Sequence, residues 1–127
     1  MPDAADLDDM QFDHERLDVY NLSLDFLVLT ERLITALPRG RAHLADQLTR
    51  ASLSIVLNIA EGAGKVSAGD KRRYYLSARG SATESAALLD VYLRLALATI
   101  EDHDSGKATL VRIVSMLVKL ARSLEDR

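Results

Sequence analysis

Apolar residues recur along this chain with the spacing of amphipathic helices. Val19, Leu22, Phe26, Leu29 and Leu33 follow one another at intervals of three or four residues, which places them on one helical face. Three later segments repeat this spacing. The pattern therefore predicts four helices, which run over about residues 18–37, 41–63, 67–99 and 105–125.

Residues that stop or start helices mark the boundaries. Pro38 follows the first helix and Gly62 closes the second, while Ser67 with Asp70 three positions later is typical of a capped N-terminus. The connections are short, and short connections make neighbouring helices antiparallel. The fold class that we predict is all-α, an antiparallel up-down-up-down four-helix bundle over residues 18–127.

The second and third helices carry features that one small core does not require. The second helix is apolar nearly all round, which indicates that a further face meets another subunit. The third has small side chains in its middle, among them Gly80, and glycine destabilises a helix by about 1 kcal/mol relative to alanine. We therefore expect close helix packing or a bend at Gly80, and a homo-oligomer.

Composition narrows the class of protein further. Among 127 residues, Gly (6), Pro (2) and aromatic residues (5%) are too few for most β-sandwiches or barrels. The chain has no cysteine, which excludes disulfides, thiolate zinc sites, iron–sulfur clusters and cysteine nucleophiles. No apolar run is long enough for a membrane span and no secretory signal is visible, so we expect a soluble cytoplasmic protein.

Charge is distributed unevenly along the chain. The net charge is −3, but residues 1–18 hold seven acidic residues and one basic residue, so the rest of the chain carries +3. We expect residues 1–17 to be an acidic tail that stays solvated and disordered. Such a tail could also cover a basic surface of the bundle.

The polar residues show no metal-binding or nucleotide-binding pattern. His14, His43 and His103 are isolated in the sequence and lack the spacing of a metal site. The glycines around Lys65 do not match a phosphate-binding loop, and no serine lies in a nucleophile elbow. We therefore predict no metal and no cofactor.

Two lone acids on the apolar helices are the remaining catalytic candidates. A pair of carboxylates could in principle perform acid–base chemistry. The simpler interpretation is structural, with Glu61 and Glu84 paired with Arg50 or Arg79. We therefore predict that the protein is not an enzyme.

The densest positive stretch lies at the start of the third helix. It combines cations that can neutralise phosphates with aromatic rings that can stack on unpaired bases. Its candidate nucleic-acid-binding residues are Lys65, Lys71, Arg72, Arg73 and Arg79, together with Tyr74 and Tyr75. Cations near a helix N-terminus oppose the helix dipole, which indicates an external anionic partner. The alternative is a solvated helix start without a ligand.

Two stretches resemble a known protein family. The second helix ends with N-I-A-E-G at residues 58–62, and the third contains A-R-G-S-A-T-E at residues 78–84. With L-D-V-Y at residues 17–20, they resemble the four-helix bundle proteins encoded in intervening sequences of bacterial 23S ribosomal RNA genes. The resemblance covers about residues 17–124. Val56 stands where this family commonly has proline.

The resemblance implies an assembly and a range of partners. Such proteins are small antiparallel bundles that assemble into ring-shaped homopentamers. A similar bundle is the accessory protein of diversity-generating retroelements, where it partners a reverse transcriptase and RNA. The residues that match the family motif are Asn58, Glu61, Gly62, Gly80, Ser81 and Glu84. Their small or polar character at helix contacts indicates packing and register rather than catalysis.

Two functions follow as hypotheses. The first is a non-enzymatic oligomer that binds RNA or DNA through the cations of the third helix, where a ring multiplies a weak patch by avidity. The second is a protein-interaction scaffold or accessory subunit, for example for a reverse transcriptase or another nucleic-acid enzyme. Salt separates them, because phosphate contacts weaken steeply with salt and an apolar protein groove does not.

Overall fold

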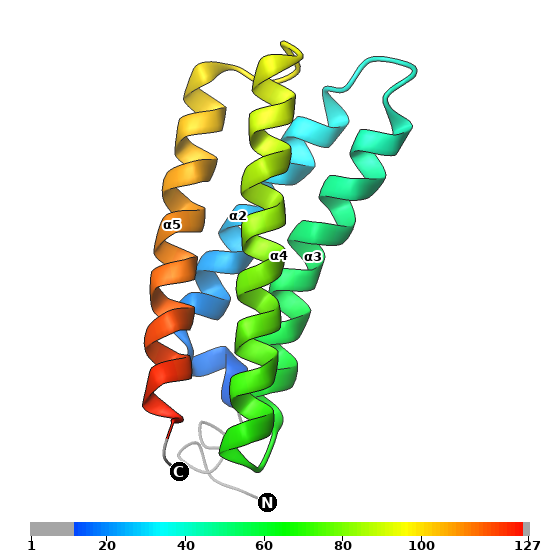
Figure 1. Ribbon diagram of the computed structural model, residues 1–127. Helices are drawn as coiled ribbons and strands as arrows, with labels where there is room; N and C mark the ends of the chain where they lie inside the picture. The colour runs from blue at the N-terminus through cyan, green and yellow to red at the C-terminus, as the bar shows by residue number, and fades with distance from the viewer. Residues whose placement is uncertain (1–11, 126–127) are drawn as a thin grey trace, which may run out of the picture.

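The computed structural model describes residues 12–125, which contain one short 3-10 helix, four long α-helices and no strand. The 3-10 helix η1 spans Asp13–Arg16, and the long helices are α2 (Asp18–Thr35), α3 (Ala42–Gly64), α4 (Ala68–Arg94) and α5 (Ile100–Ser123). Figure 1 shows the four long helices side by side as a bundle. The predicted all-α, four-helix fold class is confirmed.

Each long helix packs against two of the others. α2 and α4 both contact α3 and α5, whereas the backbones of the two diagonal pairs, over the described residues, do not approach one another. All four helices direct apolar side chains inward, and Phe26, Ile55, Leu89 and Ile113 are fully buried. Removing these surfaces from water is the main force that holds the bundle together. None of the described helices is long and apolar enough to cross a membrane.

Side-chain caps set the start of two helices. Ser67 Oγ accepts a hydrogen bond from the N–H of Asp70 at 3.1 Å, as predicted, and Thr99 Oγ1 accepts one from the N–H of Asp102 at 3.1 Å. Because Thr99 is the cap, α5 begins at Ile100 rather than near residue 105. The same pattern, a hydroxyl with an acid three positions later, stands at both places.

Helix α4 ends at Arg94 and does not reach residue 99 as predicted. Ala96 has a φ of 58°, in the left-handed region. Its N–H donates to the carbonyl of Leu93 at 3.0 Å, and the N–H of Leu97 donates to the carbonyl of Tyr92 at 2.7 Å. These two bonds form a Schellman motif, which terminates the helix.

Two glycines allow helices to approach closely. A Cβ at Gly106 would lie 2.7 Å from Leu89 Cδ1, and a Cβ at Gly62 would lie 3.0 Å from both Tyr74 Cβ and Tyr75 Cε1. A side chain at either position would therefore force a neighbour to move, which favours glycine there. A Cβ at Gly80, by contrast, would meet no atom within 4 Å, so nothing within one subunit explains that glycine.

The disorder predicted for residues 1–17 does not hold for residues 12–17. Residues 13–16 form η1, which packs against α3. Phe12 stacks on His14 with ring centroids 5.6 Å apart, and His14 meets Tyr20 edge-on at 4.6 Å. Aromatic contacts hold this segment in place. The prediction of disorder considered only the acidic charge of the segment and not these contacts. Residues 1–11 of the predicted tail lie outside the described residues.

Candidate functional site

The bundle itself engages two of the five predicted cations. Lys71 Nζ donates to the carbonyl of Ala63 at 2.8 Å, and so satisfies an orphan carbonyl at the end of α3. Arg72 Nη2 lies 3.4 Å from Glu125 Oε1, beyond the end of α5, and Arg72 Nε is buried without a partner among the described residues. Lys71 therefore closes the end of α3, whereas the ion pair of Arg72 is as long, and about as exposed, as those of Lys65 and Arg73.

Two other cations flank the ring of Tyr74. Lys65 Nζ lies 5.2 Å and Arg73 Cζ 5.1 Å from the ring centroid, both within the range of cation–π attraction. Lys65 also pairs with Glu61, and Arg73 with Asp70, each at 3.4 Å. We call Lys65, Arg73 and Tyr74 the Tyr74 cluster. It is the part of the predicted patch that the structure brings together.

The remaining predicted residues lie elsewhere. Tyr75 is 4% exposed and its ring packs against Gly62, so the prediction that it stacks on a base is wrong. Burial raises the pKa of Tyr75, with a smaller contribution from the charge of Asp13. Arg79 is exposed, but it follows Arg73 by six residues, which is a rotation of about 240° on an α-helix. Arg79 therefore faces away from the Tyr74 cluster.

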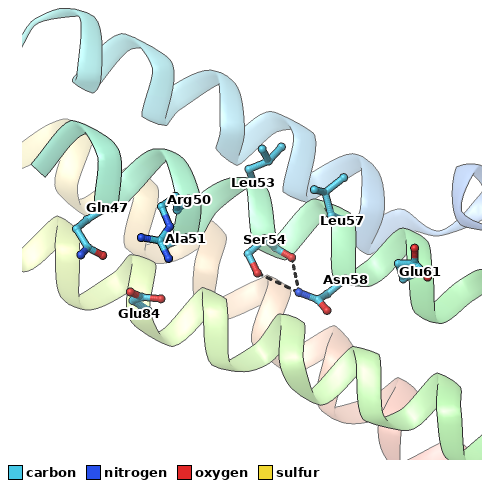
Figure 2. Close-up of a pocket in the computed structure, with 9 residues that line it drawn as sticks. All are labelled: Gln47, Arg50, Ala51, Leu53, Ser54, Leu57, Asn58, Glu61 and Glu84. Carbon is cyan, nitrogen blue, oxygen red and sulfur yellow. Dashed lines mark hydrogen bonds between the residues drawn. The ribbon is translucent and has the colours of Figure 1, made fainter. Parts of the chain in front are cut away.

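A solvent-open groove of about 480 Å³ runs between α3 and α4 (Figure 2). Helix α3 contributes polar side chains and two exposed leucines, and α4 contributes one acid. The side chains drawn in Figure 2 that form this lining are Gln47, Arg50, Ala51, Leu53, Ser54, Leu57, Asn58, Glu61 and Glu84. The groove therefore contains three of the family-motif residues.

Hydrogen bonds at the groove connect α3 to α4. Asn58 Nδ2 donates to the carbonyl of Ser54 at 2.9 Å and to Ser54 Oγ at 3.0 Å (Figure 2). Ser54 Oγ in turn shares a hydrogen bond of 2.8 Å with Ser81 Oγ. Asn58 and Ser81 thus lie in one network that sets the register of the two helices. Ser54, which links them, could not be predicted from the sequence, because a serine on a helix carries no distinguishing signal.

The two lone acids do not have their predicted partners. Glu61 pairs with Lys65, one helical turn away, and no ion pair joins Glu84 to Arg50 or Arg79 in the described part of the chain. Both acids are exposed, because they lie on the outer sides of α3 and α4. The predicted pairing with Arg50 or Arg79 is therefore wrong, and Glu61, Glu84 and Arg50 line the groove instead.

The outer side of α3 keeps apolar side chains in solvent. Leu53 is 39% exposed and Leu57, one turn later, is 54% exposed. On the neighbouring α4, Gly80 leaves open space beside its backbone. Single exposed leucines are common, but these two line one groove. They are the further apolar face that the pattern of the second helix predicted.

A separate charged cluster lies where α4 connects to α5. His103 Nε2 is 2.8 Å from Asp90 Oδ1, and its Nδ1 is 2.9 Å from Asp104 Oδ1. Lys107 Nζ lies 2.7 Å from the same Asp90 oxygen. The hydrogen bond to Asp90, then that to Asp104, raises the pKa of His103, while Lys107 and then His103 lower the pKa of Asp90. Within residues 12–125, no group of three or more His, Asp or Glu side chains is arranged so that it could hold a metal ion.

Replacement of His103 by glutamine is expected to change stability in a pH-dependent way. The folded state favours the imidazolium, so its stabilisation is fully present below about pH 6.5 and is lost as the pH rises through the raised pKa. Urea unfolding of both proteins from about pH 5.5 to about pH 8.5 measures this difference. His43→Gln, at an exposed position of α3, is the control. A difference for His103→Gln that stays constant with pH contradicts the prediction.

Comparisons with known proteins were made for sequence and for fold. A family model described as 23S rRNA-intervening sequence protein matches residues 15–119. A solved structure of a protein of unknown function from the S23 ribosomal protein family of Bacteroides thetaiotaomicron is 24% identical, with a TM-score of 0.76. That match covers 82% of this chain and 95% of the other, and at this identity it shows the fold alone. No curated protein matches the chain.

Proposed function

The chain belongs to the family of 23S rRNA-intervening sequence proteins, and from this membership we propose that it is a non-enzymatic oligomeric bundle that binds RNA or DNA through the Tyr74 cluster. The observation that carries the proposal is the pair of cations on the Tyr74 ring, with the Arg73 side chain 67% exposed. Cations neutralise phosphates, and a guanidinium beside a ring offers a surface for an unpaired base. The lack of cysteine suits the cytoplasm, where we place this activity.

The proposal includes an assembly. We expect the helices in up-down-up-down order, since only three to six residues connect consecutive long helices. We expect the subunits in a ring, a homopentamer by resemblance, joined through the face that contains Leu53, Leu57 and Gly80. The exposed leucines support this, as does the space beside Gly80, which a helix of another subunit could fill. A ring repeats the Tyr74 cluster and adds weak contacts by avidity.

Fluorescence anisotropy across a salt series tests the nucleic-acid proposal. The probes are labelled structured RNA, single-stranded RNA and duplex DNA. Lys65→Ala/Arg73→Ala is expected to lower affinity at least about tenfold at low salt and to flatten the salt dependence, because about two phosphate contacts disappear per subunit. Lys71 and Arg72 are left intact, so that their contacts with Ala63 and Glu125 do not change.

The matched control removes two exposed cations of α5, through Arg112→Ala/Lys119→Ala. It changes the net charge by the same amount, and affinity is expected to stay within about twofold of the unmodified chain. An equal loss in both double variants would mean that overall charge, not the Tyr74 cluster, governs binding. No binding of any probe at low salt would rule out the nucleic-acid function.

The alternative function is an accessory subunit or scaffold for another protein. The mixed lining of the groove favours it, because apolar leucines lie beside Arg50, Glu61 and Glu84 as in many protein interfaces. Light scattering separates the cases. A mass of several subunits, reduced to one subunit by Leu57→Asp, supports self-assembly through this face. A single-subunit mass for the unmodified chain leaves the groove open to a different protein and favours the accessory role.

A further inference from the structure

The N-terminal segment runs directly to the end of α3. Phe12, Asp13 and His14 line a hollow of about 610 Å³ together with residues near the end of α3, among them Leu57 and Lys65. The ring contacts of His14 with Phe12 and with Tyr20 fix the place at which the described chain begins. This place therefore adjoins Lys65, a member of the Tyr74 cluster.

A carboxylate of this segment already influences the start of α4. The charge of Asp13 contributes to the raised pKa of Tyr75, which follows Tyr74 in the chain. Asp13 also lines the hollow that contains Lys65, so the segment lies beside one residue of the Tyr74 cluster. In Figure 1 η1 lies at the same end of the bundle as the α3–α4 connection.

The residues that precede Phe12 are negatively charged, which is opposite to the charge of Lys65 and Arg73 in the Tyr74 cluster. Residues 1–11 contain four aspartates, Asp3, Asp6, Asp8 and Asp9, and no basic residue. Asp9 is three residues from Phe12, which an extended chain spans in about 10 Å, and Asp3 is nine residues away, or about 30 Å. These lengths limit how far each aspartate can lie from Phe12, which lines the same hollow as Lys65.

Lys65 and Arg73 can exchange their present carboxylate partners for others. Lys65–Glu61 and Arg73–Asp70 are both long, at 3.4 Å, and each acid is more than half exposed. Exposed ion pairs of this kind hold their partners weakly. A tethered carboxylate competes at an effective concentration in the millimolar range.

We propose that residues 1–11 dock on the Tyr74 cluster, with carboxylates of Asp8 and Asp9 on Lys65 and Arg73, and so exclude phosphates from it. The regulatory part of this inference rests on the proposed nucleic-acid function, whereas the docking itself does not. The binding partner of the Tyr74 cluster is thus a segment of the same chain. Its carboxylates take the places that the phosphates of a nucleic acid would otherwise occupy.

Zero-length crosslinking with a carbodiimide tests the docking without nucleic acid. The reagent joins a carboxylate to an amine in contact with it, and mass spectrometry of the digested full-length protein locates the amide. We expect crosslinks from Lys65 to Asp8 or Asp9, which disappear at about 1 M salt, where the Debye length is about 3 Å. The Lys107–Asp90 pair, at 2.7 Å, is the internal positive control.

Three outcomes of this arm overturn the docking. One is the absence of tail crosslinks to Lys65 while Lys107–Asp90 is detected. Another is preferential crosslinking to Lys119, an exposed lysine that lines a different hollow near Leu17. The last is crosslinking only between light and isotope-labelled heavy chains after mixing, which would mean that the segment binds a second copy.

Nucleic-acid binding tests the masking. The variant Asp3→Asn/Asp6→Asn/Asp8→Asn/Asp9→Asn is expected to bind single-stranded RNA at least about threefold more tightly at low salt. The matched control, with the same change in charge at exposed acids of the helices, is Asp25→Asn/Glu31→Gln/Asp46→Asn/Glu101→Gln. Equal gains in both variants would overturn the masking in favour of net charge. If no variant binds RNA, the proposed function fails, and the crosslinks still decide the docking.

Discussion

Replacement of Phe26 by alanine is expected to lower the free energy of unfolding by about 4 kcal/mol. Phe26 is 1% exposed on α2, and its ring edge lies 3.7 Å from the position of a Cβ at Gly106 on α5. The bundle is therefore packed tightly around the ring, and truncation leaves a cavity that neighbours fill only in part. Urea unfolding followed by circular dichroism measures the loss. Both proteins are compared at one concentration, because assembly makes stability concentration-dependent.

Val28→Ala, two residues later on the same helix, is the control for this substitution. Val28 is 65% exposed, so its truncation is expected to change stability by no more than about 0.5 kcal/mol. A loss at Phe26 as small as that at Val28 would mean that α2 does not pack on α5 as described.

Replacement of Gly62 by leucine is expected to destabilise the fold by about 3 kcal/mol. The first added atom, the Cβ, would already lie 3.0 Å from Tyr74 Cβ and from the Tyr75 ring. Tyr74 Cβ is bonded to the backbone of α4, so relief requires a shift of that helix. Thermal unfolding measures the loss, and nucleic-acid affinity is expected to fall with it, because Tyr74 moves.

Gly64→Leu is the matched control, two residues further along α3. No atom lies within 4 Å of a Cβ at Gly64, and its φ is not positive, so a side chain fits there. We expect a change within about 0.5 kcal/mol. Equal losses at Gly62 and Gly64 would argue against the close approach of α4 to Gly62.

The number of helices could be predicted from apolar spacing because each helix buries one continuous stripe. The same spacing predicted the wrong end for α4, because Leu95 and Leu97 continue the series of apolar residues beyond Arg94, where the helix ends. Helices that end in a left-handed residue usually have glycine there, and here alanine occupies the position at Ala96. The start of α5 could have been predicted from Thr99, because an acidic residue follows it three positions later, as Asp70 follows Ser67.

The candidate site was less predictable, because charge density along a sequence does not give direction in space. Consecutive residues on a helix point about 100° apart, so Lys71, Arg72 and Arg73 contact Ala63 at the end of α3, Glu125 beyond α5 and Asp70 respectively. Ion pairs between side chains of different helices also depend on how each helix is rotated about its axis. The spacing of residues in the sequence does not give this rotation. The contact of Glu61 with Lys65 is different, because residues four apart on a helix are neighbours by geometry.

The arrangement of neighbours in the bundle bears on how the chain reaches its fold. Among the four long helices, three of the four contacting pairs are consecutive in sequence, and only α2 with α5 brings distant parts together. Local pairings cost little loop-closure entropy, and proteins dominated by them fold within microseconds to milliseconds. The pairs of consecutive helices can therefore form early. We expect the slow step to be the closure that brings Phe26 against Gly106, so that substitutions at that contact slow folding more than those between α3 and α4.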